Sequence, residues 1–236
     1  MSEPVDVLRV AGLQAFYGDT RVLHGVDLNV RRGELVSLLG RNGAGRTTTL
    51  KAVMGLVDRR SGSVRIDGVE AIGRPPHRIA RMKVGYCPEE RGIYASLSAE
   101  ENLLLPPVVG EGGMSVDEIY ALFPNLAARR RSQGTRLSGG EQQMLALARV
   151  LRTGARLLLL DEITEGLAPV IVQTLATAIE TLKARGLTIL LVEQNFRFVA
   201  PLADRHYVLE QGRVVESVAA DELQAKAGLL ERYLTV

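Results

Sequence analysis

The sequence predicts an α/β fold with a mainly parallel β-sheet that carries helices on both faces. Short, nearly continuous apolar runs, typical of strands buried on both faces, alternate with segments of helical periodicity. Strand–helix–strand alternation is typical of parallel sheets covered by their crossover helices. With 236 residues, of which 46% are hydrophobic and 24% charged, the chain can bury a sizeable core.

The composition and charge of the chain argue against several classes of protein. Lys and Arg total 29 and Asp and Glu total 27, and a net charge of +2 does not suggest a general binder of nucleic acids or membrane surfaces. No apolar run approaches the roughly 20 residues that span a bilayer. The acidic N-terminus, Met1 to Asp6, lacks the pattern of a signal peptide. The single cysteine, Cys87, is expected to be a packed strand residue. We expect a soluble cytosolic protein.

The first third of the chain is expected to contain short strands followed by one helix. Val7 to Val10 is one strand, and apolar residues alternate with polar ones from Val26 to Val30, as in a strand with one buried face. Leu35 to Leu39 is nearly continuous and predicts a strand buried on both faces. Thr47 to Met54 is expected to be helical and to end at Gly55.

The middle of the chain, about residues 90–153, is expected to be a mostly helical insert. Ser98 to Glu101 and Ser115 to Glu118 both have the S-x-x-E form of a capping box. We expect Pro106-Pro107 and Pro124 to end the helices that these boxes open.

The last third returns to alternating strands and helices. Leu157 to Leu160 and Thr188 to Val192 are expected to be buried strands. Between them, the apolar stripe from Ile171 to Leu182 predicts a helix. Tyr207 to Val215 is expected to form a hairpin that turns at Gln211-Gly212.

A glycine-rich loop joins the third strand to the first helix. Gly40 to Thr47 reads G-R-N-G-A-G-R-T and matches the phosphate-binding P-loop, G-x-x-x-x-G-K-[ST], in its required context. Its glycines let backbone N–H groups close around phosphate oxygens, and the helix N-terminus adds its dipole. Thr47 offers a hydroxyl to Mg²⁺. The candidate nucleotide-binding residues of this loop are Gly40, Arg41, Asn42, Gly43, Ala44, Gly45, Arg46, Thr47 and Thr48.

Arg46 departs from the P-loop pattern, which has lysine at this position. The positive charge is kept, but a guanidinium is planar, wider than an ammonium, and prefers bidentate contacts. We therefore expect Arg46 to affect nucleotide binding less than it affects the geometry needed to cleave the γ-phosphate.

Two carboxylates, Asp161 and Glu162, follow the buried strand at 157–160. At the carboxyl end of a parallel strand beside a P-loop, Asp161 is placed to hold Mg²⁺ and its waters. Glu162 is then placed to polarise the attacking water as general base. An apolar strand followed by two acids is by itself common at protein surfaces, so the nearby P-loop carries this interpretation.

Leu137 to Glu141 reads L-S-G-G-E and predicts a second anion site. Ser138 and Glu141 form a capping box at the start of a helix. The exposed N–H groups of Gly139 and Gly140, together with the Ser138 hydroxyl, would form an anion site at the helix N-terminus. Because the P-loop already serves this chain's own ATP, a second phosphate site implies the nucleotide of a partner subunit.

With these three motifs in this order, the chain resembles the ATP-binding subunit of an ATP-binding cassette (ABC) transporter over essentially its whole length. The resemblance implies the ABC ATPase fold as a single domain over 1–236. A RecA-like P-loop core with an antiparallel β-subdomain would cover 1–89 and 154–236, and a helical signature subdomain about 90–153. It also implies ATP and Mg²⁺ as ligands, and a second ATPase subunit in a head-to-tail homo- or heterodimer. Such a dimer sandwiches two ATP molecules between the P-loop of one subunit and the L-S-G-G-E of the other.

The resemblance also suggests roles outside these motifs. Tyr17 occupies the place of the aromatic residue that stacks on adenine, although it could instead be a simple strand residue. Glu165 to Pro169 matches the loop that crosses the dimer interface. Ile163 stands where proline commonly follows the catalytic glutamate, a departure that the sequence does not explain.

A narrower resemblance rests on Val84 to Tyr94, Glu101-Asn102, Leu191 to Asn195 and Leu229 to Leu234. These segments are similar to the smaller ATPase subunit of bacterial branched-chain amino acid importers, which are close to urea and amide importers. Glu89 stands where most cassettes have the glutamine that senses Mg²⁺ and the membrane partner, and we count it with Thr47 and Asp161 among the candidate metal-site residues. Gln194 stands where most cassettes have the histidine that contacts the γ-phosphate.

The resemblance implies an ATPase that energises an importer of branched-chain or other hydrophobic amino acids. Its partners would be a second ATPase subunit, two transmembrane permease subunits and, indirectly, an extracytoplasmic solute-binding protein, at the cytoplasmic face of the bacterial inner membrane. The permease contact is expected in the groove between the core and the helical insert, near Glu89 to Tyr94.

Two alternatives stay open: an importer of urea, amides or aromatic acids, and a nucleotide-binding clamp whose partner does most of the hydrolysis. No nucleic acid is expected as a partner. Cassette ATPases of DNA repair or translation carry long coiled-coil inserts or two cassettes in one chain, whereas this sequence has one P-loop and one L-S-G-G-E in 236 residues.

Overall fold

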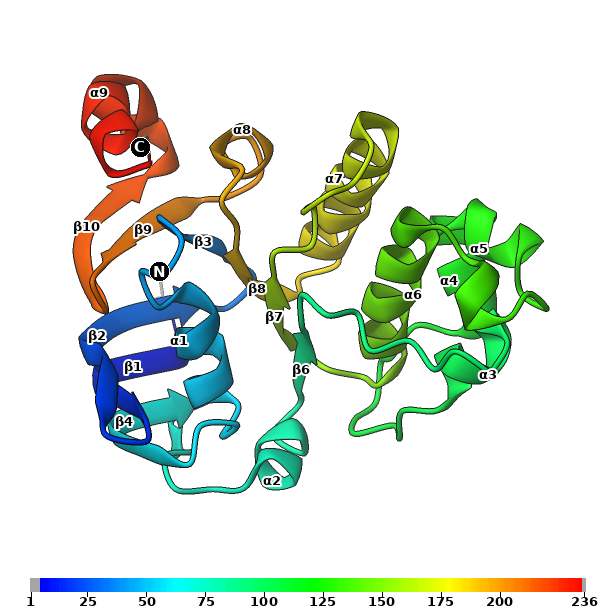
Figure 1. Ribbon diagram of the computed structural model, residues 1–236, viewed down its shortest axis with the longest axis horizontal. Helices are drawn as coiled ribbons and strands as arrows, with labels where there is room; N and C mark the ends of the chain where they lie inside the picture. Colours follow the sequence, from blue (N-terminus) through cyan, green and yellow to red (C-terminus); the bar gives the residue numbers. More distant parts are fainter. Residues whose placement is uncertain (1–4, 235–236) are drawn as a thin grey trace.

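The apolar runs of the sequence form the centre of a six-stranded sheet in the computed structural model (Figure 1). The strand order is β10–β9–β3–β8–β7–β6, and every neighbouring pair is parallel except β9 with β10. The strands are β3 Leu35–Gly40, β6 Val84–Cys87, β7 Leu157–Asp161, β8 Thr188–Val192, β9 Arg205–Glu210 and β10 Arg213–Ala219. The predicted mainly parallel sheet and the terminal hairpin are confirmed.

A second, antiparallel sheet contains four strands in the order β2–β1–β4–β5. Its strands are β1 Asp6–Tyr17, β2 Thr20–Arg31, β4 Arg59–Ile66 and β5 Val69–Glu70. The structure describes residues 5–234, so Met1 to Pro4, part of the segment expected to lack a signal-peptide pattern, lies outside the described residues.

Each central strand packs on both faces, which explains its continuous apolar sequence. In β3, Leu35 and Leu39 belong to one hydrophobic cluster, with residues of the helices α6 (Gly139–Arg152), α7 (Pro169–Ala184) and α8 (Phe196–Val199). Val36 and Leu38 belong to the other, with α1 (Arg46–Val53) and the antiparallel sheet. Helices therefore cover both faces as predicted, but on one face α1 shares the cover with a second sheet. Cys87 is fully buried in its strand, as expected.

The helices fall into two groups in Figure 1: α3 to α6 lie together between β6 and β7 in the chain, and the others flank the two sheets. The helices are α1 Arg46–Val53, α2 Pro76–Ala80, α3 Ala99–Leu104, α4 Val116–Leu122, α5 Pro124–Ala128, α6 Gly139–Arg152, α7 Pro169–Ala184, α8 Phe196–Val199 and α9 Leu223–Leu234. Short 3₁₀ turns lie at Gly134–Arg136 and Ala220–Glu222. Within residues 5–234, no helix is long and apolar enough to cross a membrane.

The predicted helix starts at the capping boxes are confirmed. Ser98, Ser115 and Ser138 each cap a helix and bond to the glutamate three residues later. Pro124 was expected only to end a helix. It also begins α5, because its missing N–H would have no intrahelical partner at the first helical position.

Candidate nucleotide-binding site

The P-loop backbone bends sharply between β3 and α1. Gly40 and Gly45 have φ values of 154° and 103°, a region that other residues rarely adopt. A Cβ atom at Gly40 would collide with the carbonyl oxygen of Leu209, and one at Gly45 would lie 2.8 Å from the Leu23 side chain. Glycine is therefore required at both ends of the loop by conformation and by close packing.

The turn of the terminal hairpin anchors this loop. The Gly212 N–H donates to the Ala44 carbonyl at 2.9 Å, and the His24 N–H donates to the Gly212 carbonyl at 2.8 Å. The chain thereby connects the P-loop to β2 through two backbone hydrogen bonds. This arrangement holds the loop in place without using its own N–H groups.

Arg46 is the first residue of α1, and its side chain is buried, with 4% exposed. One guanidinium nitrogen, Nη2, lies 2.8 Å from Glu162 Oε1 and donates to Asn42 Oδ1 at 3.1 Å. The other, Nη1, is buried without a hydrogen-bond partner in the part of the chain that the structure describes. Because buried donors are rarely left unpaired, Nη1 fits an anionic ligand group such as a phosphate oxygen.

Thr47 and Asp161 are joined by a hydrogen bond between their side chains. The Thr47 hydroxyl donates to Asp161 Oδ1 at 3.0 Å, and the Tyr86 hydroxyl donates to Asp161 Oδ2 at 3.1 Å. Burial raises the pKa of Asp161, and these two hydrogen bonds oppose the shift. Hydroxyl and carboxylate oxygens are ligands that Mg²⁺ prefers. No cluster of three or more His, Cys, Asp or Glu side chains suited to a metal exists among residues 5–234, so phosphate and water oxygens would have to complete the coordination.

Tyr86 was not singled out from the sequence. It lies on β6, which pairs in parallel with β7, and its neighbour in the ladder is Leu159. The sequence feature that could have identified Tyr86 is its polar hydroxyl on an apolar strand next to the strand that ends in Asp161. Burial and the nearby Asp161 charge raise the pKa of Tyr86, so the hydroxyl stays a donor.

Glu162 follows directly after β7 and has φ of 44°. Burial raises the pKa of its carboxyl, the Arg46 cation opposes this effect, and the nearby Glu165 adds to it. A carboxyl whose pKa lies above its usual range is better suited to take a proton from water near neutral pH.

A hollow of about 440 Å³ opens beside these residues, and we call it the P-loop hollow. Its lining comprises Tyr17, Val22, Asn42, Gly43, Gly45, Arg46, Thr47, Thr48, Glu89, Glu162 and Glu165. Tyr17 is the last residue of β1 and is 49% exposed there, so part of its side chain is accessible to a ligand. Three predicted loop residues do not line the hollow: Arg41 is exposed, and Gly40 and Ala44 are buried.

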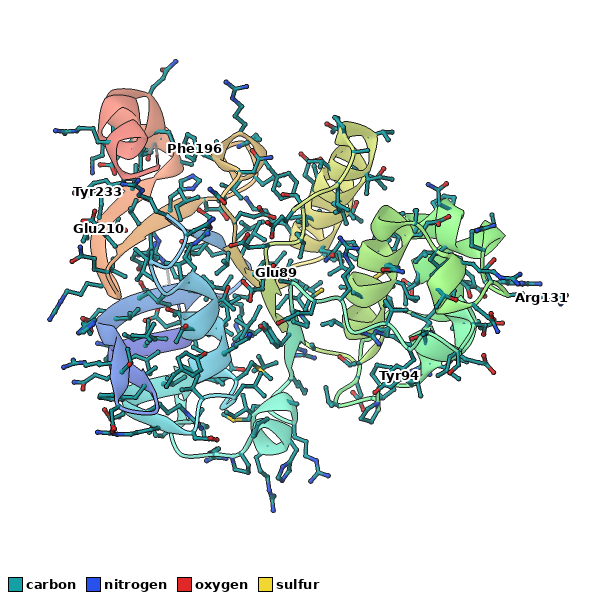
Figure 2. The ribbon with its side chains drawn as sticks, viewed as in Figure 1. Glu89, Tyr94, Arg131, Phe196, Glu210 and Tyr233 are labelled. Carbon is teal, nitrogen blue, oxygen red and sulfur yellow. The ribbon has the colours of Figure 1, made fainter. Side chains whose placement is uncertain are left out.

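Glu89 lies near the centre of the molecule in Figure 2. Burial and the neighbouring carboxylates of Glu165 and Glu162 raise its pKa. Glu89, Glu162 and Glu165 therefore line the same hollow, and Arg46 is the only basic side chain among its lining residues.

Gln194 is exposed and does not line the P-loop hollow. It shares with Glu162 a smaller hollow of about 280 Å³, the Gln194 hollow, whose other lining residues are Thr164, Glu165, Gly166, Glu193 and Asn195. Gln194 therefore shares a hollow with Glu162 but not with Arg46 and Thr47.

Ser138, Gly139 and Gly140 lie at the N-terminus of α6 and do not line the P-loop hollow. Ser138 is exposed, and its hydroxyl accepts from the Glu141 N–H at 3.2 Å. Gly140 was expected to be exposed, which is wrong. It is buried because α6 packs on α7 there, and a Cβ atom would lie 2.8 Å from the Ile171 side chain.

The segment after β6 is fixed to the helices by Arg149, which the sequence motifs did not indicate, and by Asn102, which belongs to the segments that carry the narrower resemblance. Arg149 of α6 donates to the carbonyl oxygens of Gly92 and Arg91, both at 2.7 Å. Asn102 of α3 is fully buried and accepts from the Tyr94 N–H at 2.8 Å. In Figure 2, Tyr94 lies beside these helices and Glu89 near the centre. The segment therefore bridges the P-loop hollow and the helical part.

Comparisons with known proteins agree with this geometry. A family model described as ABC transporter matches residues 23–165. The chain is 40% identical over 225 residues to the high-affinity branched-chain amino acid transport ATP-binding protein BraG of Pseudomonas aeruginosa, covering 94% of this chain and 97% of that protein. It is 36% identical to the probable branched-chain amino acid transport ATP-binding protein LivF of Archaeoglobus fulgidus, covering 92% and 94%. The lipopolysaccharide export system ATP-binding protein LptB of Escherichia coli K12 is 34% identical, covering 96% of each.

Solved structures show the same fold. A nucleotide-free ATP-binding cassette from an ABC transporter has a TM-score of 0.83 at 19% identity, over 98% of both chains. The dimeric structure of MJ0796, a bacterial ABC transporter cassette, has a TM-score of 0.78 at 24% identity, over 90% of this chain and 98% of that one. The expected cassette fold is confirmed by these neighbours.

Proposed function

Because this chain belongs to the ABC transporter family of ATP-binding proteins, we propose that it binds and hydrolyses MgATP to drive import of branched-chain or other hydrophobic amino acids. The observation that carries the proposal is that Arg46, Thr47 and Glu162 line one hollow beside the P-loop, where Thr47 donates a hydrogen bond to Asp161. The sequence similarity to BraG and LivF supports the cargo class.

The residues in and around the P-loop hollow each have a proposed task. The backbone N–H groups from Gly40 to Thr48 cradle the phosphates, and the ring of Tyr17 stacks on the base. Thr47 and Asp161, with Glu89 nearby, hold Mg²⁺. When bound, this ion neutralises charge on the phosphate oxygens. Glu162 accepts the proton of the attacking water, and Gln194 donates a hydrogen bond to the γ-phosphate.

A second ATPase subunit is the first proposed partner. Ser138 and Gly139 are accessible at the N-terminus of α6 but do not line this chain's own P-loop hollow. We infer that they bind the nucleotide of a partner subunit, homologous or identical, in a head-to-tail dimer. Within such a dimer, 1–89 and 154–236 would be the core and about 90–153 the helical subdomain.

Two permease subunits are the next proposed partners. An apolar groove of about 380 Å³ lies between β6 on one side and α6 on the other, and includes Leu56 and Pro106-Pro107. From the sequence, the docking site was expected in the groove between the core and the helical insert, near Glu89 to Tyr94. Pro88 lines the groove but none of residues 89–94 does, so we now place the permease contact beside that segment. The chain would thus sit at the cytoplasmic face of the bacterial inner membrane, and a solute-binding protein would contact only the permeases.

The test is reconstitution of the chain with its permeases and second ATPase subunit in liposomes. ATP-dependent uptake of labelled leucine supports the proposal, and uptake of urea, an amide or an aromatic acid instead supports the alternative cargo. ATP-driven movement in the opposite direction, as the export role in the name of LptB would suggest, contradicts import. Transport by this chain without membrane subunits contradicts the proposed partners.

One observation favours a second candidate, a nucleotide-binding clamp whose partner does most of the hydrolysis. The cation of Arg46 is engaged by Glu162 rather than free. Single-turnover hydrolysis in the assembled complex, with each site inactivated in turn, separates the clamp from the ATPase.

A further inference from the structure

The turn that carries Glu162 has a backbone conformation that few residues adopt. Glu162 has φ of 44°, in the left-handed region that residues other than glycine rarely enter. Such conformations persist only where surrounding contacts hold them, and they concentrate at functional sites. The contacts that hold this turn therefore determine where the Glu162 carboxylate lies.

Three contacts hold the turn, one for each of its residues. The Glu162 N–H donates to the Val192 carbonyl at 2.9 Å. The Ile163 side chain is completely buried in the hydrophobic core, which gives a physical role to the residue that stands where proline is common. Thr164 is fixed by Glu193, a residue that neither the P-loop nor the two carboxylates at the end of β7 had indicated.

Glu193 accepts hydrogen bonds from Thr164 with both carboxylate oxygens. The Thr164 N–H donates to Oε1 and its hydroxyl to Oε2, each at 3.0 Å. Only 2% of Glu193 and 6% of Thr164 is exposed, so water does not compete for these bonds. Two acceptor oxygens in a fixed fork are a property of carboxylates, and an amide side chain has only one.

A buried carboxylate is a costly way to fix a turn. Burial raises the pKa of Glu193 to about 7, although its hydrogen bonds from Thr164 oppose the shift, and the nearby Glu162 charge adds to it. A neutral amide would satisfy the Thr164 N–H without that cost. The carboxylate adds a second acceptor, which holds the Thr164 hydroxyl as well as its N–H.

Glu193 also joins the ends of two neighbouring strands. β7 and β8 pair in parallel, with Asp161 opposite Val192, so Glu162 and Glu193 are the next residues of their chains. Gln194 follows Glu193 directly and shares the Gln194 hollow with Glu162 and Thr164. One side chain thus connects the segment that carries the general base to the segment that carries the γ-phosphate contact.

Building on the proposed hydrolysis of ATP at this site, we propose that Glu193 is a positioning residue. By holding Thr164, it keeps Glu162 and Gln194 in their places beside the P-loop, and it touches neither the nucleotide nor the attacking water.

The test uses the full-length chain with four single substitutions. Glu193→Gln removes one of the two acceptors, and Thr164→Val removes one of the two donors. Thr164→Ser keeps both donors and is the conservative variant. Glu180→Gln makes the same carboxylate-to-amide change on an exposed position of α7 and is the matched control.

We expect Glu193→Gln and Thr164→Val to slow single-turnover hydrolysis by on the order of 10²-fold, with nucleotide affinity unchanged. Thr164→Ser and Glu180→Gln should keep the wild-type rate. A wild-type rate in Glu193→Gln, or equal losses of rate and nucleotide affinity, would overturn the proposal.

A second measurement does not depend on hydrolysis. Hydrogen exchange at the Thr164 amide should be slow in the wild-type chain and in Glu180→Gln, and fast in Glu193→Ala. If the wild-type chain fails to hydrolyse ATP, the proposed function fails and this measurement alone decides the role of Glu193. Unchanged protection of the Thr164 amide in Glu193→Ala overturns the inference.

Discussion

The Arg46 guanidinium lies 2.8 Å from the Glu162 carboxylate. Only 4% of the Arg46 side chain and 13% of the Glu162 side chain is exposed. The side chain expected to hold phosphate is thus paired with the proposed general base. Opposite charges favour the ionised carboxylate, so Arg46 makes Glu162 a weaker proton acceptor than burial alone would. An incoming nucleotide phosphate has to compete with Glu162 for this cation.

This ion pair strengthens the prediction that hydrolysis is slow at this chain's own P-loop. Arg46→Lys should raise single-site turnover with little change in ATP affinity, because a lysine ammonium reaches the phosphates as a compact charge. A single well-placed donor in the transition state is worth on the order of 10²-fold in rate. The measurement is single-turnover hydrolysis with the other site of the dimer inactivated.

Arg32→Lys is a suitable control, since Arg32 pairs with Asp67 and its side chain is 55% exposed. Equal or lower turnover in Arg46→Lys would show that Arg46 is accommodated and that both sites of the dimer work alike.

Glu162→Gln tests the general base directly. The amide cannot take a proton from water, so hydrolysis at this site should stop while ATP binding stays largely intact. The assay pairs the variant with a partner subunit that cannot hydrolyse ATP. Turnover at the rate of wild type in the same background would mean that another group accepts the proton.

Ser138→Arg tests the contact with the partner's nucleotide. Ser138 is exposed at the start of α6, and an arginine there would fill the space that the partner's γ-phosphate needs. Dimer formation with a non-hydrolysable ATP analogue, followed by light scattering, should be lost while nucleotide binding to the monomer persists.

Ser115→Arg controls for the lost helix cap, because Ser115 accepts from the Glu118 N–H at the same distance, 3.2 Å, as in the Ser138 cap. Undiminished dimerisation of Ser138→Arg, or equal loss in both variants, would remove the head-to-tail dimer from the proposal.

Tyr86→Phe tests whether Asp161 depends on its second hydrogen bond. Without the Tyr86 hydroxyl, the carboxylate keeps only its bond from Thr47, and its orientation toward a metal is less defined. Losses of such supporting contacts typically weaken metal binding about 10-fold or more. The Mg²⁺ concentration at half-maximal nucleotide hydrolysis should rise accordingly.

The matched control is Tyr120→Phe, since the Tyr120 hydroxyl is buried with no hydrogen-bond partner in residues 5–234. An unchanged Mg²⁺ requirement in Tyr86→Phe would limit Tyr86 to packing.

The strands and motifs could be predicted because each leaves a local pattern in the sequence. Burial on both faces makes Leu157 to Leu160 continuously apolar, and the P-loop needs glycine where the backbone turns. Gly140 was predicted incorrectly, since its burial depends on how α6 crosses α7, which no local pattern records.

The contacts that orient the site were beyond local patterns. The hydrogen bond from Tyr86 to Asp161 requires the parallel pairing of β6 with β7, which brings together residues 75 positions apart. Glu193 follows a strand, where a carboxylate usually faces solvent, and only the packing of Thr164 shows that it is buried. Motifs therefore indicate which residues react, while the supporting residues depend on the register of neighbouring strands.

Because the pKa of Glu193 is raised, the stability of the folded chain should depend on pH. This dependence distinguishes a positioning role of Glu193 from a packing role. Its folded pKa of about 7 lies above the usual glutamate value, so the folded chain binds this proton more tightly than the unfolded chain does. The stability that this proton supplies is fully present below the unfolded pKa. It is lost as the pH rises through about 7, and each tenfold difference in proton affinity between the folded and unfolded chain corresponds to about 1.4 kcal/mol.

Gln at this position carries no charge at any pH. Glu193→Gln should therefore match wild type in thermal unfolding near pH 5, and at pH 8 it should be more stable than wild type while it hydrolyses ATP more slowly. Glu180→Gln, whose side chain is exposed, should show no such pH-dependent difference. A Glu193→Gln variant that is less stable than wild type at pH 8 would mean that the charged carboxylate mainly stabilises the fold.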